Sequence, residues 1–170
     1  MKYIKAIAGS SFAALAIQPV VLLFWFVLPL WALGADLPWG QVGLVCFMSV
    51  VLALPFVMAI GIPLALLLQK TGQIGWVPMA LAGTFAGAAF AGWNLPGGDP
   101  GYSSGGNWYG KSVDFIVEGQ PTLYGWLNYI QSVVAFGLHG LAGASAFYLV
   151  WVRGMGSNNS SKPTPLRDAA

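Results

Sequence analysis

The sequence predicts an all-α integral membrane protein, a bundle of four transmembrane helices with both termini in the cytoplasm. The first observation is an uncharged run over residues 6–35, because about 20 apolar residues already span the hydrocarbon of a bilayer. The second is composition: 57% of the 170 residues are hydrophobic and 7% are charged, against about 25% charged residues in soluble domains. The third is the placement of basic residues, which favours one side of the predicted membrane.

The first span is predicted over about 12–34. Residues 1–5 contain two lysines, and residues 32–34 (Ala-Leu-Gly) fit the pattern of a cleavage site, which has small residues at its first and third positions. The segment therefore resembles a secretory leader. The apolar core of a leader is typically about 7–15 residues long, and the uncharged run here is twice that length and rich in tryptophan and phenylalanine. We therefore expect this segment to stay in the chain as a helix.

Three further spans are predicted over about 41–68, 74–93 and 127–151, the second ending before Lys70 and the fourth before Arg153. Each is a helix, because an open strand would leave backbone groups unpaired in hydrocarbon. The runs also lack the alternation of about ten residues that is typical of a membrane barrel. Residues 1–153 thus form one transmembrane domain.

The orientation follows from the basic residues of the connections. Six of the seven fall on one side, namely Lys2, Lys5, Lys70, Arg153, Lys162 and Arg167. Lys111 is alone on the other side. The excess of basic residues in cytoplasmic connections therefore places both termini inside.

Two segments lie outside the predicted membrane. The tail over 154–170 is polar and turn-prone, so we expect it to be disordered. The outer loop over 94–125 begins with a run of turn-forming residues. Its second half, over 113–117, is compatible with a short strand or with a helix lying on the membrane.

The outer loop also supplies the candidate surface for a partner. Its members are polar or aromatic: Asp99, Tyr102, Trp108, Tyr109, Asp114 and Glu118. The aromatic rings suit the headgroup region of a membrane. The carboxylates are too few and too scattered for calcium, which takes six to eight oxygen ligands, so we interpret them as a solvated surface and expect no metal site.

A candidate polar site inside the membrane consists of His139, Gln131 and Ser132, all in the fourth span. An ionisable residue at this depth is a functional candidate, here as a proton relay or a ligand contact. The alternative is a neutral imidazole bonded to a backbone carbonyl, to Gln131 or to Ser132, which would hold helices together. A single histidine excludes a bis-histidine haem.

The third span carries a candidate helix-packing face, Gly83, Gly87 and Ala91, in a GxxxG pattern extended by one alanine. Small residues at this spacing let helix backbones approach closely. The face serves either packing within the chain or self-association. Prolines at 19, 29, 55 and 63 interrupt the first two spans, and each is interpreted as a kink or as a broken helix of the kind that binds ions in transporters.

Four spans with both ends inside and a long outer loop resemble the quinone-dependent disulfide-forming membrane enzymes of bacteria. That family works through paired cysteines in both outer loops, whereas the only cysteine here, Cys46, lies in an apolar run. Without a thiol pair, disulfide exchange is excluded.

The sequence therefore predicts a protein of the bacterial cytoplasmic (inner) membrane that binds a partner rather than catalysing a reaction. Its partner is another membrane protein or a second copy of the chain, as in accessory subunits and toxin-immunity proteins. No cofactor is expected, and a net charge of +2 gives no footprint for nucleic acid. The alternative is a small transporter or channel that uses His139 and the kinked first two helices.

Overall fold

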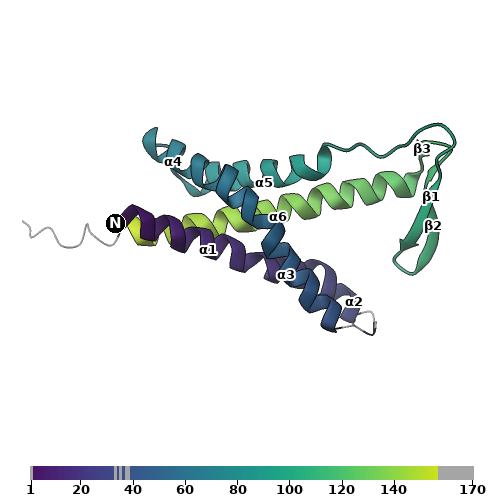
Figure 1. Cartoon of the computed structure of the whole chain (residues 1–170), viewed down its shortest axis with the longest axis horizontal. Helices are drawn as coiled ribbons and strands as arrows, with labels where there is room; N and C mark the ends of the chain where they lie inside the picture. Colours follow the sequence, from purple (N-terminus) through teal and green to yellow (C-terminus); the bar gives the residue numbers. More distant parts are fainter. Residues whose placement is uncertain (1, 33, 35, 37–38, 157–170) are drawn as a thin grey trace, which may run out of the picture.

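The computed structural model describes residues 2–32, 34, 36 and 39–156. These residues form a mostly helical chain with one small sheet (Figure 1). The elements are α1 (Lys2–Leu22), η1 (Leu23–Val27), α2 (Leu28–Ala32), α3 (Trp39–Phe56), η2 (Val57–Gly61), α4 (Ile62–Lys70), α5 (Trp76–Gly92), β1 (Ser104–Trp108), β2 (Lys111–Val117), β3 (Gln120–Pro121) and α6 (Leu123–Gly156).

Three continuous helical segments are long and apolar enough to cross a membrane: Tyr3–Ala32, Trp39–Lys70 and Leu123–Met155. The second and fourth predicted spans lie wholly inside these segments, and the first predicted span does so up to residue 32. Gly34 lies in a turn, and residue 33 lies outside the described residues. The fourth apolar helix, α5, has 17 residues, at the lower end of the range of about 17–25 that spans a bilayer. The predicted tail starts inside α6, which runs to Gly156, and its remainder lies outside the described residues.

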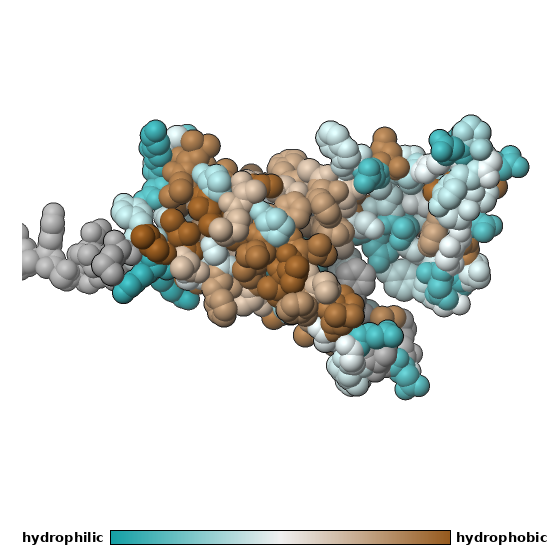
Figure 2. Space-filling model, viewed as in Figure 1, coloured by the Kyte–Doolittle hydropathy of each residue, from teal (hydrophilic) through white to brown (hydrophobic). Residues whose placement is uncertain are grey.

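The helices α1 and α6 lie side by side and run in opposite directions, and α5 lies along α6 (Figure 1). The segment α3–η2–α4 crosses over α1. Buried side chains gather where α1, α4, α5 and α6 meet, and they include Met79 and the stacked rings of Phe147 and Trp151, whose centroids lie 5.9 Å apart. Most large apolar side chains instead face outward. Figure 2 shows them as a brown band between polar ends, the distribution expected of a protein dissolved in lipid.

Both helical segments that carry predicted kinks contain one π turn. In η1 the N–H of Leu28 donates to the carbonyl of Leu23, and in η2 the N–H of Ile62 donates to the carbonyl of Val57. Each of these bonds reaches back five residues, and each donor residue directly precedes a proline. The wider turn lets the helix continue although proline lacks an N–H and clashes with the preceding turn. The interrupted spans are therefore continuous helices.

The closest helix contact joins α5 to α6 through glycines. A Cβ atom built on Gly83 would lie 2.5 Å from the carbonyl oxygen of Gly140, and one built on Gly87 would collide with the carbonyl of Phe136. A Cβ on Gly140 would in turn collide with the carbonyl of Gly83. The two backbones touch because three positions lack a side chain, which is how small residues stabilise helix pairs in lipid.

The outer segment folds into an antiparallel sheet in the order β1-β2-β3. Trp108 pairs with Lys111 across a two-residue turn, in which Tyr109 and Gly110 both have positive φ. Glu118 and Gly119 form a second turn of the same kind, and such turns match the twist of the strands that they join. The prediction of a strand or a surface helix over 113–117 is thus resolved as strand β2, and the prediction of a purely helical chain omitted this sheet.

We expect Gly140→Val to destabilise the fold by about 3 kcal/mol, because overpacking against backbone atoms cannot be relieved by a side-chain movement. Gly43→Val is the matched control, since a Cβ on Gly43 would meet no atom within 4 Å. Reversible unfolding of both variants in mixed micelles measures the difference. Equal stability of the two variants would contradict the described α5–α6 contact.

Candidate functional site

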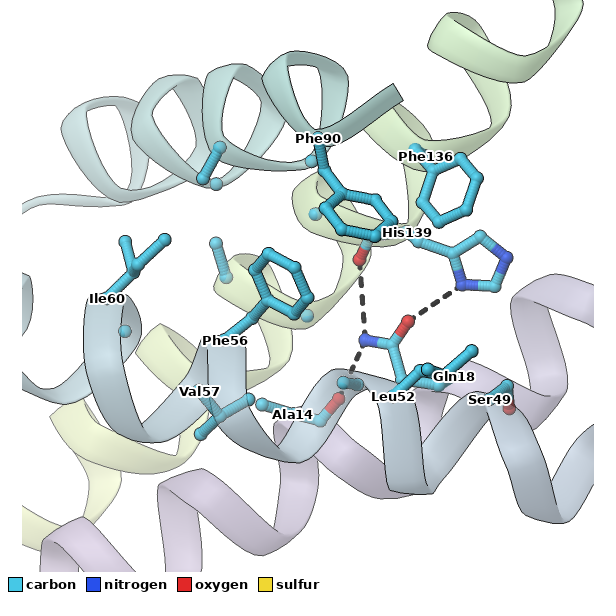
Figure 3. Close-up of a pocket in the computed structure, with 18 of the residues that line it drawn as sticks. Ala14, Gln18, Ser49, Leu52, Phe56, Val57, Ile60, Phe90, Phe136 and His139 are labelled. Carbon is cyan, nitrogen blue, oxygen red and sulfur yellow. Dashed lines mark hydrogen bonds between the residues drawn. The ribbon is translucent and has the colours of Figure 1, made fainter. Parts of the chain in front are cut away.

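A hydrogen-bonded pair of polar side chains joins α1 to α6 within the apolar band. The Nδ1–H of His139 donates to the Oε1 of Gln18 over 2.7 Å. The Nε2 of Gln18 donates to the carbonyl oxygen of Ala14 at 2.9 Å and to that of His139 at 3.4 Å (Figure 3). Gln18 is only 5% exposed, so its amide is satisfied almost entirely by the protein.

This network assigns the tautomer of a neutral His139. Both amide hydrogens of Gln18 are directed at carbonyl oxygens, so its Oε1 is the atom that faces the imidazole and must accept. The ring proton therefore sits on Nδ1, and Nε2 carries a lone pair. Within the described part of the chain, Nε2 of His139 has no hydrogen-bond partner, and it is not among the buried unpaired atoms. It is an open acceptor.

The pair borders a cavity of about 340 Å³ between α1, α3–η2–α4, α5 and α6. Its wall is apolar apart from Gln18, His139 and Ser49, and the hydroxyl of Ser49 donates to the carbonyl of Cys46 at 2.7 Å. One side carries an aromatic row: the ring centroids of Phe56 and Phe90 lie 5.0 Å apart and those of Phe90 and Phe136 lie 5.3 Å apart (Figure 3).

The cavity lies where residues with little or no side chain gather, because glycine and alanine make up 11 of its 26 described lining residues. On α5 these are Ala82, Gly83, Ala86 and Gly87. The crossing of α3 over α1 then leaves a volume that no side chain fills, and Gly61 in the π turn adds to it on the opposite wall. A void lined by apolar groups and large enough for a ligand is the usual form of a small-molecule site.

The structure does not bring Gln131 and Ser132 to His139. The Nε2 of Gln131 donates to the hydroxyl of Tyr109 at 2.9 Å, and the hydroxyl of Ser132 donates to the carbonyl of Asn128 at 2.9 Å. The partner of His139 is instead Gln18, a residue that the sequence reasoning did not select. The available indication was that Gln18 is an amide within an uncharged run and precedes a proline.

The candidate helix-packing face lies within the fold. Gly83 and Gly87 face α6, as described above, and Ala91 is half-buried one turn further along α5. At the end of this helix the hydroxyl of Tyr129 donates to the carbonyl of Gly92 at 2.9 Å. The face is therefore occupied by the chain itself along the length of the α5–α6 contact.

The candidate outer surface is distributed over the sheet. Trp108 is surrounded by the rings of Tyr109, Phe115 and Tyr124, with centroids 5.2 to 6.5 Å away. Tyr109 is nevertheless 66% exposed, and Tyr102 is 50% exposed.

The three acidic residues of that surface occupy separate places. Asp99 and Glu118 lie at turns, and Asp114 lies in β2 opposite Gly105. Among the described residues no group of three or more His, Cys, Asp or Glu side chains is placed to hold a metal ion.

No family model, curated protein or solved structure matches this chain.

A double-mutant cycle on Gln18→Leu and His139→Phe should give a coupling of about 0.6 kcal/mol in unfolding free energy, the average measured for hydrogen bonds between membrane helices, and at most about 1.7 kcal/mol. Gln131→Leu is the control, because its partner is Tyr109, and it should show no coupling to His139→Phe. Coupling between Gln131 and His139, with none between Gln18 and His139, would refute the described pairing.

Proposed function

We propose that this chain is a four-span protein of a bacterial cytoplasmic membrane that acts by binding a partner on its outer side. The orientation is supported by the ends of the helices. Lys5, Lys70 and Arg153 are exposed at one end, where α1 begins and α6 ends (Figure 1). The outer segment, which carries Asp99, Asp114, Glu118 and Lys111, lies at the other end. Basic residues favour the cytoplasmic side.

The fourth crossing in this proposal is α5. At a rise of 1.5 Å per residue, its 17 residues extend about 25 Å, which is slightly less than the hydrocarbon thickness of about 30 Å. It lies against the much longer α6, and Trp76 and Trp93 stand at its two ends. Tryptophan at both ends suits the two interfaces of a membrane. A helix shorter than the hydrocarbon thickness is tolerated when the side chains that flank it extend to the membrane surface.

The observation that carries the binding role is that the outer segment is a preformed sheet anchored to the helices. The hydroxyl of Thr122 accepts from the N–H of Gly125 at 3.2 Å and so caps α6. The same hydroxyl donates to the carbonyl of Asp114 at 2.6 Å, and the N–H of Thr122 donates to that of Phe115 at 2.9 Å. A surface held in place by such bonds loses little entropy when a partner binds.

The exposed aromatic residues of the outer segment, on the sheet and in the loop before it, are of the kind that dominate interfaces. Tyr102 and Tyr109 present large rings to solvent, and tyrosine is enriched among the residues that contribute most to binding. Because Gly83 and Gly87 already contact α6, the small-residue face offers little to a partner. The proposal therefore rests on the sheet, with the outward domain of another membrane protein as its partner.

A second candidate function, a small transporter or channel, is favoured by one observation. The cavity beside His139 is bordered by both proline-interrupted segments, and the π turn η2 contributes Val57, Ile60 and Gly61 to its wall. Single π turns occur frequently at functional sites. This role requires that the cavity open alternately to the two sides.

The proposed orientation is tested by cysteine labelling in a Cys46→Ala background. Ser103→Cys, in the outer segment, should react in intact cells with a membrane-impermeant maleimide. Thr71→Cys, in the exposed turn after α4, should react only after the cells are opened. The reverse pattern would invert the proposed topology.

The binding role predicts that Tyr102→Ser and Tyr109→Ser each reduce recovery of the partner by about tenfold, equivalent to about 1.4 kcal/mol. Tyr3→Ser is the matched control, because Tyr3 is similarly exposed (52%) but lies at the other end of the bundle. Quantitative mass spectrometry after crosslinking in intact cells measures recovery. A monodisperse monomer with no crosslinked protein would rule out the role.

A further inference from the structure

We propose that the cavity beside Gln18 and His139 binds a neutral lipophilic alcohol, with the apolar chain in the cavity and the hydroxyl donating to the pair. The inference does not depend on the binding role of the sheet. Gln18, Ser49 and His139 have the only polar side chains among the more than twenty described residues that line the cavity. Such a wall selects a molecule that is mostly hydrocarbon.

The remaining hydrogen-bonding capacity of the pair fixes the polar group of the ligand. Both amide hydrogens of Gln18 and the Nδ1–H of His139 already donate within the protein. What remains is the second lone pair of Gln18 Oε1 and the lone pair of His139 Nε2. Because Gln18 and His139 can only accept further hydrogen bonds, the ligand must carry a hydrogen-bond donor. Ethers, esters and ketones lack such a donor, and their own oxygen would also stay unpaired in a dry site.

The ligand is neutral, because the described wall of the cavity carries no acidic side chain to pair with an ammonium group and no basic side chain other than His139. A charge without a partner would be strongly disfavoured there. A hydroxyl on an apolar skeleton satisfies both conditions. This hydroxyl donates a hydrogen bond to the free Nε2 of His139. Binding then removes water from only one uncharged polar group of the ligand.

The size and surroundings of the cavity indicate where the ligand comes from. Its volume of about 340 Å³ is at the low end of ligand sites, which run from about 300 to 1,000 Å³, so it accommodates one chain rather than a whole phospholipid. It lies within the apolar band and is partly open to its surroundings. Two sources share the required chemistry: a free long-chain alcohol, or the hydroxyl-bearing part of a neutral lipid.

The test uses the full chain in lipid nanodiscs with two photoreactive probes, a diazirine-bearing dodecanol and its methyl ether. The ether lacks the hydrogen-bond donor and carries one additional methyl group. We expect the alcohol to bind about tenfold more tightly, the upper end of what one hydrogen bond supplies, and to label residues of α3, η2 and α5. Equal binding of alcohol and ether, or labelling confined to the outer faces of the helices, would overturn the proposal.

Two variants locate the site. Gly61→Leu should abolish labelling in the cavity, since a Cβ on Gly61 would meet only Phe56 and Val57, at 3.9 and 4.0 Å, and the longer side chain would fill the void. Gly43→Leu, in the same helical segment with no atom near its Cβ, should label as the parent does. Unchanged labelling of Gly61→Leu would contradict the site.

A third variant tests the polar contact separately from the fold. The double variant Gln18→Leu/His139→Phe removes both free acceptors, so it should reduce binding of the alcohol to the level of the ether and leave labelling by the ether unchanged, which also shows that the cavity is intact. If the alcohol keeps its advantage in this double variant, the pair is not the acceptor and the proposal fails.

Competition by unlabelled dodecanol and by dioleoylglycerol distinguishes the two sources. Displacement by dioleoylglycerol indicates a neutral lipid, displacement by dodecanol alone indicates a free alcohol, and displacement by neither overturns the site. Tyr102→Ser should keep its labelling even where it loses the partner, so the two proposals can fail independently.

Discussion

For helices that cross a membrane, as we propose these do, the absence of water from the hydrocarbon is the constraint on which the rest of the structure depends. A polar group in that region must find its partner inside the protein, at a cost of several kcal/mol if it does not. Gln18 and His139 form a hydrogen bond across two helices, and the hydroxyls of Ser49 and Thr84 donate to carbonyls of their own helices at 2.7 and 2.8 Å. The π turns before Pro29 and Pro63 follow from the same requirement. In each, the residue before the proline keeps its backbone hydrogen bond, with the carbonyl five residues back as the acceptor.

The second consequence concerns packing, because lipid provides no hydrophobic force that drives two helices together. The contact of α5 with α6 relies instead on the close approach of backbones at Gly83, Gly87 and Gly140. The same small residues cannot fill the space on the side where α3 crosses, and the cavity results. The small residues of α5 therefore account both for the tight packing against α6 and for the cavity on the side of α3.

The sequence alone was enough to predict the elements that depend only on the composition of their own segment. Uncharged runs and their flanking charges located the apolar helices, because hydrocarbon admits little else. The sheet was only half anticipated: β2 contains β-branched and aromatic residues, whereas β1 reads Ser-Gly-Gly-Asn-Trp and acquires its strand geometry from pairing with β2. The pair of Gln18 and His139 is separated by 121 residues, and it depends on the rotation of α1 against α6. No spacing rule within one helix could have indicated it.

The helix with the least support from the protein forms one wall of the cavity. The segment α3–η2–α4 buries a single residue, Ala65, and neither α3 nor η2 buries any. By contrast, α6 contacts both α1 and α5 along much of its length. Local stability follows the number of buried contacts, so the wall formed by α3 is the one that can move without disturbing the polar pair or the glycine contact. A molecule in the cavity would touch α3, α5 and α6 together. It would thereby add to the second span the packing that the chain itself does not supply.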